Sequence, residues 1–410
     1  MKIIVFGGSG KMGAAVAWDL VKEEDVTEVA LVGRRKESLQ RVKDWIGSDK
    51  VTLVPLDIAN REETKAAMQR YDVGVNTLPD RRTSYLTAHA AVEAGLNIVD
   101  MLEEFHRRPD AYETEGLVLP EGMSLDEYGD WLHETAIKNG VTFMSGIGFA
   151  PGISNITVGE GIRKLDRADT AIARVGGIPS KQAAKRHPLR YMITWAFRHV
   201  LREYMLQVEV IKDGKVVEVP AMSDLEPFRF SKFGKDEDLE AAVTPGMPSF
   251  IFTRSDLKEF AEKTVRWPGH WQGIATLKEC GLLELDPVEV DGVPVVPREL
   301  LFQTIEPRLK PLEGDTDVCV MWNTVVGEKD GRQKRIDYYM WDEADTENGI
   351  SSMGRVTGYS AAIGALFVGR ELITEKGIVA PEDCFDGERY DRFIQEVEKR
   401  DIHILEEISE

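Results

Sequence analysis

Short apolar runs alternate with amphipathic stretches along the first third of the chain. The apolar runs predict strands at 2–6, 29–32, 51–56, 73–76, 97–99 and 141–144. Apolar residues at helical spacing predict helices between them, at 14–21, 62–70, 84–94 and 125–138. Strands that alternate with helices form a parallel sheet with right-handed crossovers. The fold class predicted here is therefore α/β, with a Rossmann-type doubly wound parallel sheet.

The pattern changes after this region to two-residue alternation. Residues 208–211 and 215–219 alternate around a turn at Asp213-Gly214, which predicts an antiparallel hairpin. Alternation recurs at 316–325 and 335–341, and it predicts further antiparallel strands. We therefore predict a second, α+β domain with a mainly antiparallel sheet, inserted into the first.

The stretch from 354 to 369 consists largely of small and apolar residues. A helix of this composition needs both of its faces covered, so we expect it to return to the first domain. The predicted boundaries are a nucleotide-binding domain at 1–152 completed by 350–410, and a substrate-binding and dimerisation domain at 153–349.

A glycine cluster directly follows the first predicted strand. Residues 8–13 have the GxGxxG spacing, and a helical pattern follows them. Glycines let the backbone turn tightly and approach a pyrophosphate, while the helix N-terminus offers unpaired N–H groups to its charge. The alternative is a glycine turn without a ligand. The predicted cofactor contacts in this turn are Gly7, Gly8, Ser9, Gly10, Lys11, Met12 and Gly13.

The end of the second strand indicates which dinucleotide is bound. An NAD-preferring site usually has Asp or Glu about 20 residues after the glycine turn, whereas this chain has Gly33-Arg34-Arg35-Lys36. Two guanidinium groups suit a 2′-phosphate, so Arg34 and Arg35 favour NADP, with NAD as a possible second cofactor. The alternative is a solvated basic loop.

Two more strand ends are predicted to contact the cofactor, because ligands bind beyond the carboxyl ends of parallel strands. Asp57 and Ile58 are expected at the adenine edge. Asn76, Thr77 and Leu78 are expected on the phosphate and nicotinamide side. An ordinary loop role is the alternative for each.

Composition excludes several classes of partner. Lys and Arg number 51 and Asp and Glu 71, a net charge of −20 that repels nucleic-acid phosphates and anionic lipid. The uncharged stretch 139–159 contains Pro151 and several glycines, so we interpret it as a buried strand plus turn and not as a membrane span. Three widely spaced cysteines without a CxxC pair predict no metal site and a cytoplasmic location.

Several segments together carry a family resemblance. They are the glycine loop, GFAPGISN at 148–155, the 188–204 segment, TVRWPGH at 264–270, and GRVTGYSAAIGA from Gly354. With Asn76 to Pro79, they resemble the saccharopine dehydrogenase-like family, especially its lysine 6-dehydrogenase and carboxynorspermidine dehydrogenase members. The chain departs from the family pattern at Arg190, at Trp267 and at 107–123, which looks like an insertion.

This resemblance implies an NAD(P)-dependent oxidoreductase acting on a CH–NH or CH–NH2 group. The substrate would be a small amino acid or polyamine-type molecule, oxidised or formed through an imine, and the enzyme would be a homodimer. Arg266 and Arg198 are expected to hold a carboxylate, and His270 and Asp100 to move a proton. The predicted catalytic residues are His270, Arg266, Asp100, Tyr204 and Arg198.

Other interpretations of these residues stay open. Arg266 can be a partner in an internal salt bridge, His270 a structural hydrogen-bonding residue, Asp100 a turn cap, and Tyr204 part of a dimer surface. A short-chain dehydrogenase is excluded, because none of the ten tyrosines has Lys four residues later. A non-catalytic, NADP-binding redox sensor is the alternative function.

Overall fold

The computed structural model describes residues 1–111 and 117–410, so part of the predicted insertion at 107–123 lies outside the described residues. The chain divides into two compact units. Unit 1 comprises Met1–Lys164, Met247–Arg254 and Gly354–Ile402, and unit 2 comprises Leu165–Gly246, Ser255–Met353 and His403–Glu410.

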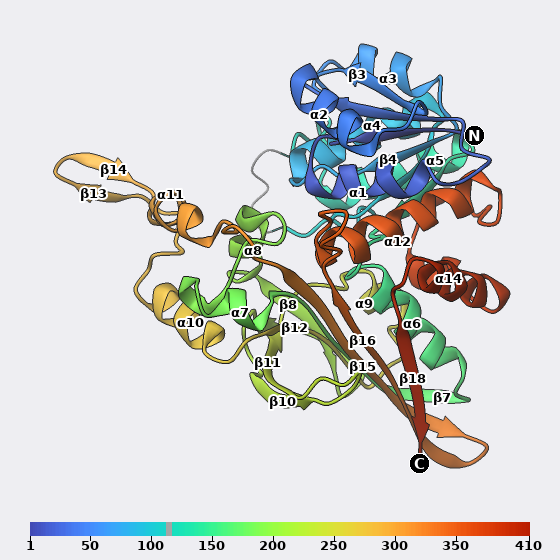
Figure 1. Ribbon diagram of the computed structural model, residues 1–410. Coiled ribbons are helices and arrows are strands. Elements are labelled where there is room, and N and C mark those ends of the chain that lie inside the picture. The colour runs from blue at the N-terminus through green and yellow to red at the C-terminus, as the bar shows by residue number, and fades with distance from the viewer. Residues whose placement is uncertain (112–116) are drawn as a thin grey trace. The chain divides into compact units, whose positions relative to one another are not determined.

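Unit 1 is built on a seven-stranded parallel sheet with the order β17-β6-β5-β4-β1-β2-β3 (Figure 1). Its strands are β1 (Lys2–Phe6), β2 (Glu28–Gly33), β3 (Val51–Pro55), β4 (Val73–Asn76), β5 (Asn97–Asp100), β6 (Thr142–Ser145) and β17 (Gly377–Val379). Residues 3–6 of β1 are fully buried, as expected of a central strand covered on both faces. The predicted doubly wound sheet is confirmed.

Helices connect these strands, and all but the one at 36–46, which was not predicted, lie close to the predicted positions. They are α1 (Lys11–Leu20), α2 (Lys36–Ile46), α3 (Arg61–Met68), α4 (Arg81–Ala94) and α5 (Leu125–Lys138). Asp80 caps α4, and Ser124 with Glu127 forms a capping box on α5. These polar caps explain where the two helices begin.

The uncharged stretch 139–159 contains more than the predicted strand and turn. After β6 and a turn, helix α6 (Ile153–Arg163) begins at Gly152, whose φ is 134°. In the described part of the chain, no helix is long and apolar enough to cross a membrane.

The C-terminal part of unit 1 adds a helix and an edge strand to the parallel sheet. Helix α12 (Ser352–Gly369) packs on α1, because a Cβ at Gly358 would lie only 3.0 Å from the Ala15 Cβ. Strand β17 then pairs with β6. The short helices α9 (Phe250–Thr253) and α13 (Pro381–Cys384) and the longer α14 (Glu388–Lys399) complete the unit.

Unit 2 contains a nine-stranded sheet in which, among the described residues, β12 and β7 form the one parallel pair. Its strands are β7 (Arg167–Pro179), β8 (Gln207–Lys212), β9 (Lys215–Pro220), β10 (Glu226–Phe230), β11 (Glu237–Val243), β12 (Glu259–Arg266), β15 (Asp317–Lys329), β16 (Arg332–Glu343) and β18 (Ile404–Ser409). The predicted β8–β9 and β15–β16 pairs are both antiparallel. The expectation of a mainly antiparallel sheet is confirmed.

Four α-helices, a 3-10 helix (Pro188–Arg190) and a separate hairpin complete the described part of unit 2. The helices are α7 (Lys181–Ala184), α8 (Phe197–Glu203), α10 (His270–Glu279) and α11 (Pro297–Leu309). The hairpin of β13 (Val288–Val290) and β14 (Val293–Val295) forms a two-stranded sheet of its own and projects beyond α11 (Figure 1).

The boundaries of the two units differ from the predicted domain boundaries. Residues 247–254 belong to unit 1, although they lie inside the predicted second domain. Residues 403–410 belong to unit 2, because β18 pairs with β16 over Ile404–Ser409. Both differences arise because the chain passes from one unit to the other at positions that the sequence pattern does not reveal.

Candidate functional site

The glycine turn after β1 is a close-packed cradle. A Cβ at Gly13 would lie 2.4 Å from the Gly7 carbonyl oxygen, and a Cβ at Gly7 would lie 2.7 Å from the Thr77 hydroxyl. Gly7 also has a φ of 79°, which favours glycine. No side chain caps the first turn of α1, whose N-cap is Gly10. The backbone N–H groups of this turn are therefore available to a phosphate.

The two arginines after β2 lie next to this turn in the sheet. A Cβ at Gly33 would lie 3.5 Å from the Ser9 hydroxyl, which places the ends of β1 and β2 in contact. Arg34 and Arg35 are exposed, and neither guanidinium has a hydrogen-bond or ion-pair partner among the described residues. Such cations suit a phosphate group and not the bare ribose hydroxyls of NAD.

The other predicted cofactor residues lie at the carboxyl ends of β3 and β4. The Thr77 hydroxyl donates a 2.8 Å hydrogen bond to the Phe6 carbonyl and so ties β4 to the glycine turn. Asp57 is exposed and accepts a hydrogen bond from the Ala59 N–H, while Ile58 and Leu78 pack partly into the core. These residues, the glycine turn and the arginines occupy one edge of the sheet, an arrangement that fits a dinucleotide phosphate.

Asp100 lies in unit 1 at the end of β5 and is buried. Its carboxylate accepts hydrogen bonds from the Asn76 amide at 2.6 Å, the Ser84 hydroxyl at 2.7 Å and the Leu102 N–H at 2.6 Å. Ser84 Oγ lies 2.9 Å from His106 Nε2. Because its carboxylate already accepts three hydrogen bonds, Asp100 serves to orient Asn76. This role is closer to that of a turn cap than to that of the predicted proton carrier.

A second cluster surrounds Arg266 at the end of β12 in unit 2. Arg266 is 4% exposed, and its guanidinium lies 5.3 Å from the ring centre of Tyr191 and within hydrogen-bond reach of Tyr204. Tyr204 Oη lies 3.0 Å from His270 Nε2. The structure therefore brings together three of the predicted catalytic residues, Arg266, Tyr204 and His270.

The hydrogen-bond directions around His270 follow from its contact with the Leu189 carbonyl. His270 Nδ1 lies 3.1 Å from the Leu189 carbonyl oxygen, which only accepts, so Nδ1 carries the proton and Nε2 accepts from the Tyr204 hydroxyl. The Tyr204 oxygen then accepts from Arg266 Nε at 3.4 Å and Nη2 at 3.3 Å. His270 thereby fixes the Tyr204 hydroxyl beside the arginine.

Arg266 has N–H groups that are not used within the described part of the protein and can bind a ligand. A guanidinium has five N–H groups, and two of them point at Tyr204 while one Nη1–H donates to the Val265 carbonyl at 3.0 Å. One N–H remains on each terminal nitrogen, and no carboxylate pairs with them among the described residues. The alternative of an internal salt bridge is therefore not what the structure contains. Two such N–H groups form the fork that binds a carboxylate at both oxygens.

Tyr191 is a site residue that the sequence analysis missed. It is 1% exposed, and in the described part of the chain its hydroxyl has no hydrogen-bond partner. Burial raises the pKa of Tyr191, so the hydroxyl stays protonated and can donate. The tyrosine lies within the segment 188–204 noted for its family resemblance, but nothing in a single sequence indicates that its hydroxyl lacks a partner.

The predicted proton-transfer role of His270 conflicts with its surroundings. The imidazole is 1% exposed, and burial, together with the nearby Arg266 charge, lowers the pKa of His270 to about 3. At neutral pH the ring is therefore neutral and a poor proton acceptor. Its two hydrogen bonds instead give it a positioning role.

Arg198 does not join this cluster. It lies on α8, and its exposed guanidinium pairs with Glu299 at 2.6 Å and stacks over Phe302 at 3.8 Å. The side chain is 54% exposed, so the ion pair is largely solvated. The prediction of a second carboxylate clamp is not supported, because the family resemblance that suggested it does not fix which face of the helix is buried.

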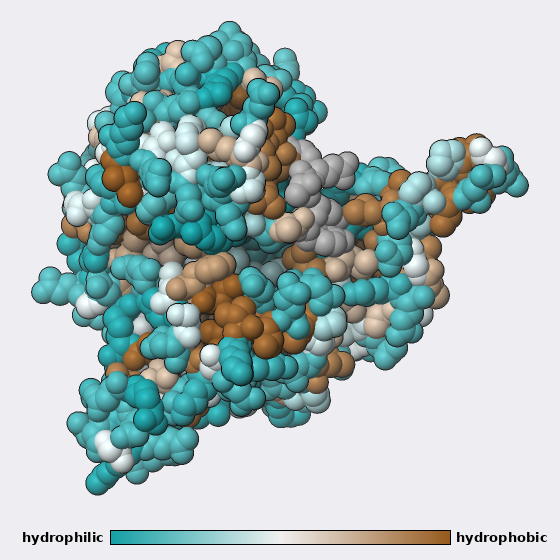
Figure 2. Space-filling view, turned by 180° about the vertical axis from the view of Figure 1, so that it is seen from behind, coloured by the Kyte–Doolittle hydropathy of each residue, from teal (hydrophilic) through white to brown (hydrophobic). Residues whose placement is uncertain are grey.

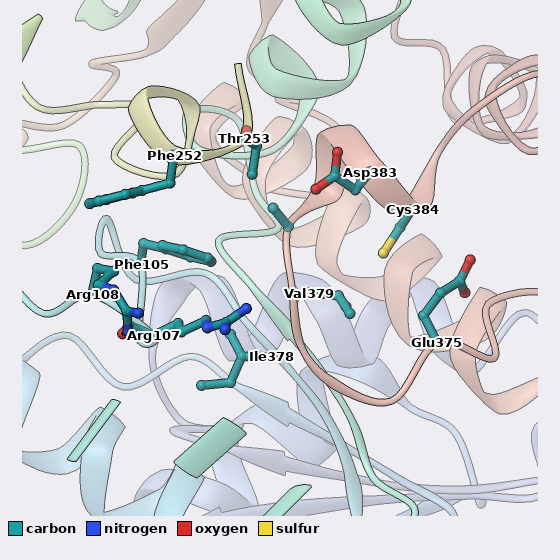
Figure 3. Close-up of a pocket in the computed structure, with 11 residues that line it drawn as sticks. Phe105, Arg107, Arg108, Phe252, Thr253, Glu375, Ile378, Val379, Asp383 and Cys384 are labelled. Carbon is teal, nitrogen blue, oxygen red and sulfur yellow. The ribbon is translucent and has the colours of Figure 1, made fainter. Parts of the chain in front are cut away.

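A cavity of about 280 Å³ in unit 1 lies apart from the predicted site residues, none of which line it. Figure 3 shows Phe105 and Phe252 at one end, near Arg107 and Arg108, with Asp383 on the other side. Arg108 pairs with Asp130 at 2.7 Å, and Asp383 pairs with Arg254 at 2.7 Å. These charges are largely compensated within the protein, so the cavity indicates no particular ligand.

Comparison with protein families gives matches that together span nearly the whole chain. Residues 3–144 match the saccharopine dehydrogenase NADP binding domain, and residues 148–402 match the saccharopine dehydrogenase C-terminal domain. The first match contains the glycine turn, Arg34 and Arg35. The second contains the Arg266 cluster.

Individual relatives are distant but span most of this chain. A carboxyaminopropylagmatine dehydrogenase of Synechocystis is 21% identical over 93% of each chain. An NADP+-dependent, L-glutamate-forming saccharopine dehydrogenase of Pyricularia oryzae is 22% identical over 86% of this chain and 88% of the relative. The solved apo saccharopine dehydrogenase of Saccharomyces cerevisiae is 19% identical, covers both chains fully and has a TM-score of 0.77. That structural similarity shows a shared fold.

Proposed function

Because the chain belongs to the saccharopine dehydrogenase family, we propose that it oxidises, or forms by reduction, the C–N bond of a small amino acid through an imine. It is an oxidoreductase acting on CH–NH groups and its cofactor is NADP. We also propose an order among the candidate substrates. Saccharopine and lysine come first, and carboxylated polyamines such as carboxynorspermidine come second.

The observation that carries this proposal is the free guanidinium fork of Arg266. A buried cation without a paired carboxylate is costly, unless a ligand supplies the negative charge. The same guanidinium lies over the ring of Tyr191, whose hydroxyl has no hydrogen-bond partner among the described residues. An amino-acid carboxylate would satisfy both groups, which supports Arg266 as the carboxylate-binding residue.

The remaining site residues have supporting roles in this proposal. When bound, NADP supplies the nicotinamide ring that exchanges a hydride with the substrate carbon. The glycine turn holds its pyrophosphate, Arg34 and Arg35 its 2′-phosphate, and Asp100 orients Asn76 at the sheet edge. Tyr204, held by His270, keeps the Arg266 guanidinium in one orientation.

A substrate panel tests the function. Saccharopine, lysine and carboxynorspermidine are each offered with NADP+ and NAD+, and absorbance of the reduced cofactor is followed. We expect turnover with NADP+ and at least one of these amino acids. Tight NADP binding without turnover of any of them contradicts the proposal and favours the redox sensor.

We also propose a homodimer in which the β13–β14 hairpin contacts the second copy of the chain. Isolated two-stranded hairpins are marginally stable in water, yet Val288, Val290 and Val293 are each more than half exposed on this arm. Figure 2, which views the molecule from behind, shows hydrophobic residues exposed beside hydrophilic ones along the arm.

The charges on the hairpin support a second copy as its partner. Its exposed charges are acidic, at Asp286, Glu289 and Asp291. Elsewhere in unit 2, exposed Lys185 and Arg190 have no side-chain partner among the described residues. Opposite charges on two surfaces of one chain allow a reciprocal, two-fold contact.

Light scattering during size-exclusion chromatography tests the dimer. We expect the wild type to elute as a dimer and V288S/V293S as a monomer, with V216S on exposed β9 as the matched control. A monomeric wild type, or a dimer that persists in V288S/V293S, contradicts this contact. We further propose that the protein is cytoplasmic. Its three cysteines are free thiols, as expected in that reducing compartment.

A further inference from the structure

Glu262 is a buried acid on the same strand as Arg266. The two residues are four positions apart on β12, so their side chains project from the same face, with Cα atoms about 13 Å apart. Glu262 is 3% exposed. Gly246 leaves room for it, because a Cβ there would lie 2.5 Å from the Glu262 carboxyl carbon. The backbone is thus shaped around this carboxyl group.

The two oxygens of Glu262 have different surroundings. Oε2 accepts hydrogen bonds from the Thr244 hydroxyl at 2.6 Å and from the Gly246 N–H at 3.0 Å. Oε1 is buried and has no hydrogen-bond partner among the described residues. One oxygen is therefore fixed by the protein, and the other remains available to a donor.

Glu262 also lacks the cation that two other buried acids have. Buried Glu104 pairs with Arg81 at 2.6 Å, and buried Asp19 pairs with Arg400 at 2.8 Å. No Lys, Arg or His within the described residues pairs with Glu262. Burial raises the pKa of Glu262 to about 8, although its two hydrogen bonds act in the opposite direction.

Other charges near Glu262 place it in one cluster with Arg266. Glu203 on α8 raises the pKa of Glu262, and Arg266 opposes this effect. The carboxylate of Glu203 also acts on Arg266. Glu262, Glu203 and Arg266 therefore interact electrostatically in a buried region that has a free cationic fork and a free acidic oxygen.

We propose that Glu262 Oε1 accepts a hydrogen bond from the ammonium group of an amino-acid substrate whose carboxylate binds Arg266. This inference rests on the proposed function and deepens it, because it assigns a contact to the second charge of the substrate. An ammonium group supplies both the donor and the cation that Glu262 lacks. The pair selects molecules with both a carboxylate and an ammonium group over plain carboxylic acids.

Calorimetry with saccharopine as the probe tests the proposal on the NADP-loaded enzyme. At pH 7 the buried acid is protonated, and an ammonium neighbour favours its ionised form. Binding should therefore release up to about one proton from Glu262. Heats measured in buffers of different ionisation enthalpy report this number. We expect release in the wild type and in the control E259Q on the same strand, and almost none in E262Q.

Steady-state kinetics provide the second measurement. We expect E262Q to raise KM for saccharopine at least tenfold while kcat stays within threefold, and E262D to show a smaller increase. E262D also serves if E262Q fails to fold. Equal binding and equal proton release in the wild type and E262Q overturn the role of Glu262 while leaving the proposed function intact. An enzyme that neither binds nor converts saccharopine, lysine or carboxynorspermidine overturns both.

Discussion

Replacing Arg266 is the most direct test of how the substrate is held. Arg266→Met keeps the length of the side chain and removes the guanidinium, whereas Arg266→Lys keeps the charge and removes the fork. Neither change breaks an ion pair, because the guanidinium has none among the described residues. We therefore expect both variants to fold, with Arg266→Met at least as resistant to heat as the wild type.

The size of the effect follows from the two uncommitted N–H groups of Arg266. A hydrogen bond to a charged group contributes about 1.5 kcal/mol or more, so losing two costs about 3 kcal/mol. This corresponds to a roughly 150-fold fall in kcat/KM for Arg266→Met. Lysine retains the charge and one contact, so we expect a fall of about tenfold for Arg266→Lys.

Initial rates with saccharopine or lysine and NADP+ measure these values. Arg229→Met is the matched control, since Arg229 lies on β10 of the same unit and pairs with Asp236 and Asp238 at the surface. The control should retain the wild-type kcat/KM. If folded Arg266→Met stays within threefold of the wild type, the substrate carboxylate binds elsewhere and not at Arg266.

Three further predictions concern the cofactor, a buried hydroxyl and acid stability. Replacing both Arg34 and Arg35 with Ala should raise KM for NADP+ roughly tenfold and leave KM for NAD+ within twofold, and equal changes would contradict the assignment. Tyr191→Phe should leave the melting temperature unchanged, because the lost hydroxyl has no partner, yet raise KM severalfold in the same rate assay. Because the pKa of His270 is about 3 in the native protein and near 6.5 when unfolded, native stability falls as pH drops from 6.5 towards 3, by up to about 1.4 kcal/mol per unit. Urea unfolding at pH 7, 6 and 5 should show a shallower loss in His270→Asn, and equal slopes would refute this account.

The nucleotide-binding half was the more predictable from sequence. Its strands are central and parallel, so they are continuous apolar runs, and its glycine turn lies directly between one such strand and a helix. Gly13 illustrates why the motif is informative, since a Cβ there collides with the Gly7 carbonyl. The chemistry of this turn depends on local geometry, which a local pattern records.

The second half was less predictable because its site depends on contacts that are distant in sequence. Arg266, Tyr204 and His270 were identified through family resemblance, but the low pKa of His270 depends on burial beside Arg266, which sequence spacing does not reveal. Arg198 looked equivalent to Arg266 and is instead exposed. Glu262 was missed altogether, because an acid four residues before an arginine is usually a solvated neighbour.

The edge strand β17 has a consequence for how the protein is made. It pairs with β6 but consists of residues 377–379, and α12, which packs on α1, also comes late in the chain. During translation the nucleotide-binding sheet therefore leaves the ribosome with an open edge and an uncovered helix. Protein synthesis must be almost complete before the first unit closes, so we expect nascent chains to expose this open edge, and a chain that stops before residue 377 to lack the edge strand β17.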